Sequence, residues 1–252
     1  MKLVTLARDL GRRKARERDA LFVAEGIRTV EELVRSPLRI HGALIAPGLE
    51  DAPRGRALAE ALAGRAVEIA RVTDRDFGSA AQTESPQGIL AIGEMPARQL
   101  DQLALPSGAR LLILDAVQDP GNVGAILRTA AALGATATVS LPGTVDLWNA
   151  KVVRSAMGAQ FHHPTYRGTW DELDPFLGER RVPIWGTDSG GTPPGAAPAP
   201  DRLALLVGNE GSGLGAEARA RCVHVVGIPI SGAVESLNVA VATGILLYVL
   251  RP

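Results

Sequence analysis

Three short segments of this 252-residue chain combine small, amide and charged residues in patterns suited to holding a ligand. Each segment contains or directly follows an apolar run of the kind that forms a buried strand. Ligands in open α/β sheets bind beyond the carboxyl ends of such strands, so chemistry is expected at these junctions. The three segments are residues 115–130, 203–215 and 225–247.

The first segment places an amide and an arginine on one predicted helix. Asn122 follows a turn at residues 119–121 and is predicted to cap the helix through its side chain. Gly124 and Arg128 are four residues apart and share a helix face, so a ligand can approach Gly124 beneath the guanidinium. The alternative is a capped helix that carries a surface arginine.

The second segment is a glycine loop that contains Gly208, Gly211, Gly213 and Gly215. It lacks the Lys-Ser/Thr pair of a P-loop, which disfavours a triphosphate cradle. Its G-x-G-x-G spacing also suits a Rossmann-like dehydrogenase or methyltransferase, but only 37 residues follow Gly215, too few to complete a doubly wound sheet. A plain tight turn remains the alternative.

The third segment opens the last predicted helix with Ser236 and Asn238. The simplest interpretation is a helix capped by Ser236. Asn238 then lies in the first turn of an otherwise apolar helix, where an amide lowers helix propensity without an obvious gain. Its presence favours contact with a ligand.

Other kinds of site are disfavoured by the residue pattern. No serine lies in the G-x-S-x-G sequence of an α/β-hydrolase. The four histidines lack metal-ligand spacing, and Cys222 and His224 alternate along a predicted strand, so no metal is expected. The single cysteine excludes an internal disulfide, and the N-terminal apolar run is too short for a signal peptide; both predict a cytoplasmic protein.

Composition and charge indicate a globular protein whose nucleic-acid contacts must be local. The chain is 46% hydrophobic and has 27 basic and 27 acidic residues, so its net charge is zero. Residues 237–250 are the most apolar stretch, are too short to span a membrane and are predicted to form a buried helix. A basic cluster at residues 8–18 is a candidate RNA contact or a solvated helix face. Its candidate phosphate contacts are Arg12, Arg13, Lys14 and Arg16.

Apolar runs that alternate with helical patterns predict an α/β fold in two domains. The first half reads as a small α/β unit with a polar turn at residues 73–76, and the second as a parallel sheet covered on both faces. Residues 189–200, rich in Gly and Pro, are predicted to be an exposed loop without chemistry. The predicted domains are residues 1–95 and 109–252, joined by a linker at 96–108.

Taken together, the three segments closely resemble the three motifs of the SpoU (TrmH-like) RNA 2′-O-ribose methyltransferases, within the SPOUT superfamily. The motifs are N-x-G-x-x-x-R from Asn122, G-N-E-G-x-G-L from Gly208, and I-P-x-x-G-x-x-x-S-L-N-V from Ile228. Residues 1–95 resemble, more loosely, the L30e-like substrate-binding domain of ribosomal-RNA members. The resemblance implies a trefoil knot in the C-terminal domain, S-adenosylmethionine as the methyl donor, RNA as the substrate and a homodimer through the catalytic domain.

The resemblance also implies roles for individual residues. The residue matching Arg128 is proposed in the family to accept the proton of the ribose hydroxyl, but a guanidinium essentially never deprotonates, so a phosphate clamp is an equal alternative. The expected catalytic residues are Asn122, Arg128, Glu210, Ser236 and Asn238. The expected cofactor contacts are Leu206, Val207, Gly208, Asn209, Gly213, Gly227, Ile228, Ile230, Ser236, Leu237 and Asn238.

The expected activity is 2′-O-ribose methylation of a 23S-type ribosomal RNA nucleotide. Transfer RNA is a second possible substrate, although tRNA members usually carry terminal helices rather than a full N-terminal α/β domain. A non-catalytic RNA-binding assembly protein of the same fold is a third reading, and an NAD-dependent dehydrogenase a fourth. The intact Arg128, Glu210, Ser236 and Asn238 disfavour the non-catalytic protein.

Overall fold

The computed structural model describes residues 2–232 and 234–252, and its contacts divide the chain into two compact units. The first unit contains Met1–Ala97 and Asp146–His162, and the second contains Arg98–Val145 and His163–Pro252. Residues 146–162 lie inside the predicted 109–252 domain, yet their contacts group them with the first unit. The first unit is therefore not contiguous in sequence.

A four-stranded mixed sheet forms the centre of the first unit, in the order β1-β4-β2-β3. Strand β4 (Ile89–Glu94) runs antiparallel to β1 (Leu21–Glu25) and β2 (Ile40–Ile45), and β3 (Ile69–Arg71) is parallel to β2. The helices of this unit are α1 (Lys2–Asp9), α2 (Arg13–Asp19), α3 (Ile27–Arg35), η1 (Leu49–Asp51), α4 (Pro53–Gly64), α5 (Asp74–Ala80), α7 (Ala150–Ser155) and η3 (Ala159–Phe161).

Apolar side chains hold these helices to the sheet. Leu3 of α1 and Phe77 of α5 share a core cluster with Leu90 of β4. The aromatic ring of Phe22 on β1 lies against Trp148 and Phe161, with ring centroids 4.5 and 5.5 Å apart. This aromatic contact anchors the segment at 146–162 to the first strand.

The predicted turn at residues 73–76 is wrong, because a helix begins there. Thr73 is the N-cap of α5, and its hydroxyl accepts a hydrogen bond from the backbone N–H of Asp76 at 3.2 Å. The polar residues that indicated a turn are the cap and the acidic first turn of this helix.

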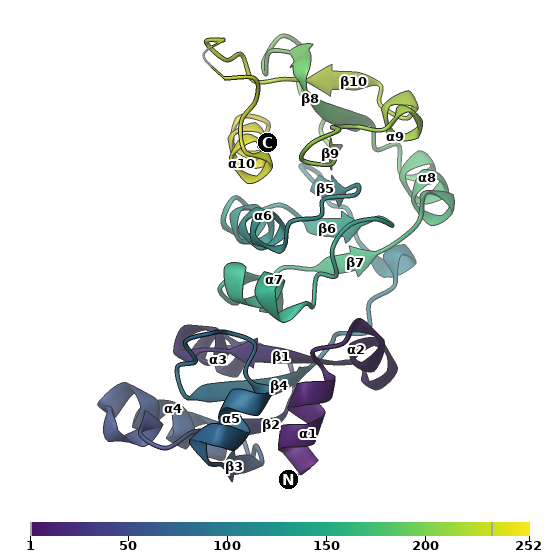
Figure 1. Cartoon of the computed structure of the whole chain (residues 1–252). Coiled ribbons are helices and arrows are strands. Elements are labelled where there is room, and N and C mark those ends of the chain that lie inside the picture. The colour runs from purple at the N-terminus through teal and green to yellow at the C-terminus, as the bar shows by residue number, and fades with distance from the viewer. Residues whose placement is uncertain (1, 233) are drawn as a thin grey trace. The chain divides into compact units, whose positions relative to one another are not determined.

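The second unit contains a six-stranded parallel sheet in the order β10-β8-β9-β5-β6-β7, as the apolar strands predicted (Figure 1). Strand β9 lies between β5 and β8, and β10 forms one edge. The elements of this unit are η2 (Leu100–Gln102), β5 (Arg110–Leu114), α6 (Pro120–Ala132), β6 (Ala137–Ser140), β7 (Thr165–Arg167), α8 (Trp170–Glu179), β8 (Ile184–Thr192), β9 (Leu203–Val207), α9 (Ala216–Ala220), β10 (His224–Val226) and α10 (Val239–Val249).

Helices cover both faces of this sheet. Helices α8 and α9 pack through Leu173, Phe176 and Ala218 against the apolar side chains of β5, β6 and β9. Helices α6 and α10 contact each other and lie on the opposite face (Figure 1). A Cβ added at Gly244 of α10 would lie 3.1 Å from the Thr129 side chain of α6, so the two helices approach closely.

Two predictions about loops and termini need correction. The stretch at 189–200 is not loop throughout, because β8 continues to Thr192. The last helix is not wholly buried: Leu246 is 1% exposed, but a row of apolar side chains faces outward. These are Val241, Ile245, Tyr248 and Val249, which are 38–53% exposed. Among residues 2–232 and 234–252, no helix has the length and apolar character needed to cross a bilayer.

The free energy of unfolding should decrease as the pH is lowered, because the histidine His163 is buried. Its ring contacts the Thr138 hydroxyl at 2.8 Å, and burial, with the nearby charge of Arg98, lowers its pKa from 6.5 to about 4. The unfolded chain takes up this proton first, so the contribution is complete above pH 6.5 and is lost as the pH falls toward 4. Between pH 7 and pH 5 the wild type should lose about 2 kcal/mol more unfolding free energy than His163→Gln, measured with urea. Equal losses in the two proteins would show that folding does not lower the pKa of His163.

Candidate active site

A cavity of about 410 Å³ opens in the second unit beyond the ends of β9 and β10 and beside the middle of β8. Parallel strands present their carboxyl ends at one edge of the sheet, which is where ligands bind in such folds. The cavity is lined by Thr187, Asp188, Ser189, Gly208, Asn209, Glu210, Gly211, Ser212, Gly213, Val226, Gly227, Ile228, Ile230, Glu235, Ser236, Leu237, Val239, Ala242 and Leu246.

Eight of the eleven expected cofactor contacts line this cavity. The exceptions are Leu206 and Val207, which are buried in β9, and Asn238, which caps α10. The residues that line it as expected are Gly208, Asn209, Gly213, Gly227, Ile228, Ile230, Ser236 and Leu237.

The sequence motifs did not predict the contribution of β8 to the cavity. Thr187, Asp188 and Ser189 line the cavity. The Asp188 carboxylate accepts a hydrogen bond from the Gly190 N–H at 2.9 Å and forms an ion pair with Arg219. Polar residues at the end of a predicted strand in a parallel sheet are the signal that could have identified them.

Glycines are required in the cavity wall because backbone segments touch there. A Cβ at Gly208 would collide with the carbonyl of Gly213, and a Cβ at Gly227 would collide with the backbone of Asp188 and Gly191. Gly213 itself has a φ of +66°, a conformation that other residues rarely adopt. The glycine loop is therefore a close-packed wall rather than a plain turn.

The Glu210 carboxylate binds the loop that leads into α6. It accepts hydrogen bonds from the backbone N–H groups of Gln118 and Asp119 at 3.1 and 2.9 Å, and from the Asn122 side-chain amide at 3.2 Å. Burial alone would raise the pKa of Glu210, but these donors outweigh it and hold the pKa below its usual value. Glu210 therefore stays ionised as an acceptor.

Asn122 links Glu210 to the start of the last helix. Its side-chain oxygen accepts a hydrogen bond at 2.9 Å from the amide of Asn238. The Asn238 oxygen in turn accepts from the N–H groups of Ala240 and Val241, so Asn238 is the N-cap of α10. The three predicted motifs thus meet in one chain of hydrogen bonds.

Two capping predictions are wrong. Asp119, rather than Asn122, caps α6 by accepting a 2.7 Å hydrogen bond from the Asn122 N–H. Asn238, rather than Ser236, caps α10, so Asn238 carries no propensity cost inside the helix. Ser236 is exposed and lines the cavity.

Arg128 lies on α6, six residues beyond Asn122 in the same helix, and its side chain is exposed. Gly124, one turn earlier on the same face, is buried. The guanidinium is thus presented at the surface of the unit that contains the cavity.

The predicted RNA contacts of the first unit separate into two groups. Arg12, Arg13 and Lys14 are exposed at the start of α2. Arg16 is not available to phosphate: it is 3% exposed, and its guanidinium binds Asp146 and the backbone carbonyls of Leu10 and Gly11. Within the described ranges, no three His, Cys, Asp or Glu side chains are arranged to hold a metal ion.

Comparison with known families decides what kind of site this is. Residues 109–248, more than half of the chain, match the model of the SpoU rRNA methylase family, and residues 2–91 match that of the MRM3-like substrate binding domain. The chain belongs to the SpoU rRNA methylase family. The resemblance found in the three motifs is confirmed, and with it the methyltransferase class and the α/β fold of its relatives.

Relatives of this SpoU family member cover both units. The chain is 35% identical over 240 residues to the 23S rRNA (guanosine(2553)-2′-O)-methyltransferase RlmP of Bacillus subtilis, covering 95% of this chain and 92% of that one. It is 30% identical to a 23S rRNA (uridine(2479)-2′-O)-methyltransferase of Streptomyces viridochromogenes, covering 95% and 85%. The crystal structure of the SpoU methyltransferase AviRb from the same organism, in complex with AdoMet, matches with a TM-score of 0.89 and 28% identity, covering 98% and 96%.

The chain of hydrogen bonds makes Asn122→Asp a direct test of the Glu210 charge. The substitution replaces the amide donor with a second carboxylate, and like charges disfavour each other's ionised form. At pH 7 we expect it to lower the free energy of unfolding by about 1–2 kcal/mol, and this deficit should shrink as the pH falls toward 4 and the pair takes up a proton. Urea unfolding at several pH values measures it.

The matched control is the same substitution in a Glu210→Gln background, where no second charge is present. There the deficit should be smaller and nearly independent of pH. A deficit that is constant with pH in the wild-type background would contradict the contact between Glu210 and Asn122.

Proposed function

We propose that this protein transfers a methyl group from S-adenosylmethionine to the ribose 2′-oxygen of a nucleotide in 23S ribosomal RNA. The observation that carries the proposal is the hydrogen-bonded chain Glu210–Asn122–Asn238, which joins the three family motifs beside the cavity. Relatives named as 23S rRNA 2′-O-methyltransferases span both units of the chain and support ribosomal RNA over transfer RNA.

The cavity suits S-adenosylmethionine in size and chemistry. Its volume of about 410 Å³ lies within the range of small-molecule sites. Ile228, Leu237 and Leu246 provide apolar walls for a purine ring, while the carboxylate of Glu235 suits a ligand that carries positive charge. When bound, this cofactor supplies an electrophilic methyl group on a sulfonium.

The residues of the chain then mainly align the acceptor with that methyl group. Arg128 binds a phosphate of the RNA through bidentate, charge-assisted hydrogen bonds, because its guanidinium does not release a proton under ordinary conditions. Asn122 and Asn238 hold the start of α6 and of α10 in register through their mutual hydrogen bond. Ser236, exposed at the cavity, orients the ribose hydroxyl or the methionine part of the cofactor.

The homodimer and the trefoil knot also remain proposals. The outward row on α10, formed by Val241, Ile245, Tyr248 and Val249, supports a dimer through the second unit, since contiguous exposed apolar side chains are typical of protein interfaces. Leu246, next to Ile245 on the same helix, is not part of this exposed row, because its side chain is buried and lines the cavity. Membership of the SpoU family supports the knot.

Cofactor binding and methyl transfer test the proposed function directly. Because residues of the SpoU motifs line the cavity, calorimetry in metal-free buffer should show binding of S-adenosylmethionine and no binding of NAD. Radiolabelled methyl groups should appear on ribose in a 23S rRNA transcript and not on a tRNA transcript. Tight NAD binding without S-adenosylmethionine binding would remove the assignment, and labelled tRNA alone would move the substrate to transfer RNA.

Arg128→Lys separates the phosphate clamp from a proton acceptor. Lysine keeps the charge but loses the planar fork, so a clamp predicts RNA binding weaker by about 1 kcal/mol, roughly fivefold, and a partial loss of rate. The pH dependence of single-turnover rates at saturating RNA should stay unchanged. A proton acceptor predicts intact RNA binding, a collapse of the rate and a shifted pH profile.

A further inference from the structure

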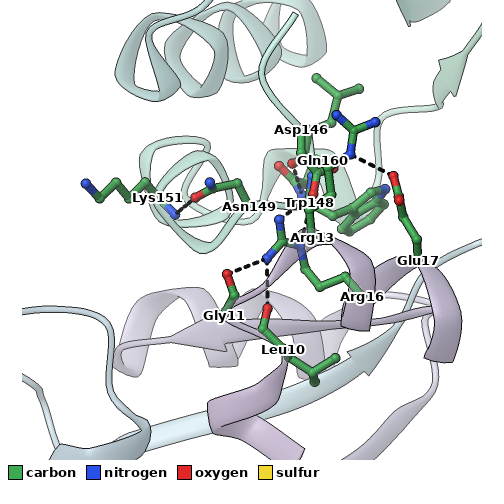
Figure 2. Close-up of polar contacts among 11 residues, drawn as sticks. Leu10, Gly11, Arg13, Arg16, Glu17, Asp146, Trp148, Asn149, Lys151 and Gln160 are labelled. Atoms are coloured by element: carbon green, nitrogen blue, oxygen red, sulfur yellow. Dashed lines mark hydrogen bonds and ion pairs between the residues drawn. The ribbon is translucent and has the colours of Figure 1, made fainter.

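Residues 146–162 come from the second half of the sequence and are held in the first unit by a buried ion pair. The Arg16 Nε and Nη2 atoms donate to the Asp146 Oδ2 atom at 2.9 and 2.6 Å, and both side chains are only 4% exposed (Figure 2). The Arg16 Nη1 atom donates to the carbonyls of Leu10 and Gly11 at 2.8 and 3.0 Å. These contacts satisfy the guanidinium on both sides.

The same carboxylate shapes the segment that follows it. The second Asp146 oxygen accepts a hydrogen bond from the Trp148 N–H at 3.1 Å, and the Asp146 carbonyl accepts one from the Asn149 N–H at 2.9 Å. Because the Trp148 ring also packs against Phe22, with the two rings tilted by 38°, the entry to α7 is fixed by polar and apolar contacts together. A buried ion pair stabilises little by itself, so its use here is better explained by the geometry that it imposes.

Helix α7 presents a cation from this fixed position. Asn149 caps the helix by accepting a hydrogen bond from the Lys151 N–H at 2.9 Å. Val152 and Val153 are buried, whereas Lys151 is exposed, and Figure 2 shows its side chain extending away from the ion pair.

Cations near the two edges of the four-stranded sheet differ in whether they have a carboxylate partner. Helices α2 and α7 both contact the edge strand β1. Within the described part of the chain, no carboxylate lies within 4.0 Å of the exposed Arg12, Lys14 or Lys151. At the opposite edge, Arg71 of β3 is held by Glu50 through two hydrogen bonds of 2.8 and 2.9 Å. Helices α2 and α7, which both contact β1, therefore each present exposed cations without a carboxylate partner.

We propose that Lys151 of α7 joins Arg12 and Lys14, at the start of α2, in one surface that binds the phosphate backbone of RNA, and that the Arg16–Asp146 ion pair positions α7 within it. Because Arg16 neutralises the Asp146 carboxylate in the interior of the unit, the charge that residues 146–162 expose to solvent is positive. The inference rests on the proposed RNA substrate and adds a contact from outside the N-terminal residues.

The full-length protein and a 23S rRNA transcript provide the test. Lys151→Ala should weaken RNA binding about fivefold near 0.1 M salt and lower the slope of log K against log salt by about 0.7–1, because one fewer phosphate is neutralised. Arg71→Ala is the matched control and should change neither quantity, and both variants should keep wild-type affinity for S-adenosylmethionine. A Lys151→Ala protein with the affinity and salt slope of the wild type would overturn the inference.

Methyl transfer in the same preparations separates this inference from the proposed function. If the wild type methylates the transcript while Lys151→Ala binds it normally, the surface is wrong and the function stands. If the wild type neither binds nor methylates the transcript, the proposed function fails and this inference fails with it.

A double-mutant cycle tests the positioning role of the ion pair. In an Asp146→Asn background, Lys151→Ala should weaken RNA binding by much less than fivefold, because α7 is no longer held in place. The single-turnover rate at saturating RNA should stay unchanged, with the loss confined to RNA affinity. Where circular dichroism shows that Asp146→Asn does not fold, Arg16→Met with Asp146→Leu replaces it, since no unpaired charge is then buried. If the affinity losses of the two single variants simply multiply in the double variant, the positioning role is wrong.

Discussion

The parallel pairing of β9 with β5 on one side and β8 on the other is the constraint on which the candidate site depends. Parallel strands all end at the same edge, so the chain must return to the far edge before each new strand. The loop after β5, the glycine loop after β9 and the segment after β10 therefore converge, although about 90 to 115 residues separate the first from the other two. No local property of the three motifs could bring them together.

Strand pairing brings the motifs close, but the charge of Glu210 gives their hydrogen bonds a direction. An ionised carboxylate only accepts, so the Asn122 amide must donate to it and turn its oxygen toward Asn238. Asn238 must then donate through nitrogen, which leaves its own oxygen for the first N–H groups of α10. One charged group thus determines the orientation of two amides and the start of the final helix.

Much of the fold could be predicted from periodicity, and the least predictable features were those decided by distant partners. The apolar runs predicted β5, β6 and β9 because strands buried on both faces read alike wherever they occur. Asn122 was mistaken for a cap because its actual partners, Glu210 and Asn238, are 88 and 116 residues away. Arg16 was predicted on the RNA face because most charged residues near it in the sequence are cations, whereas the carboxylate that binds it is 130 residues away.

The same long-range pairing explains how a chain with no net charge can present a positive surface. A sequence count weighs Asp146 equally with any exposed carboxylate, but the structure places this charge in the interior against Arg16 and leaves both without influence on solvent. At the β3 edge, Glu50 neutralises Arg71 in a solvent-exposed ion pair. A net charge of zero over the whole chain therefore does not prevent exposed cations without a carboxylate partner from remaining on α2 and α7. The local distribution of paired and unpaired charge, rather than the total, bears on binding to a polyanion.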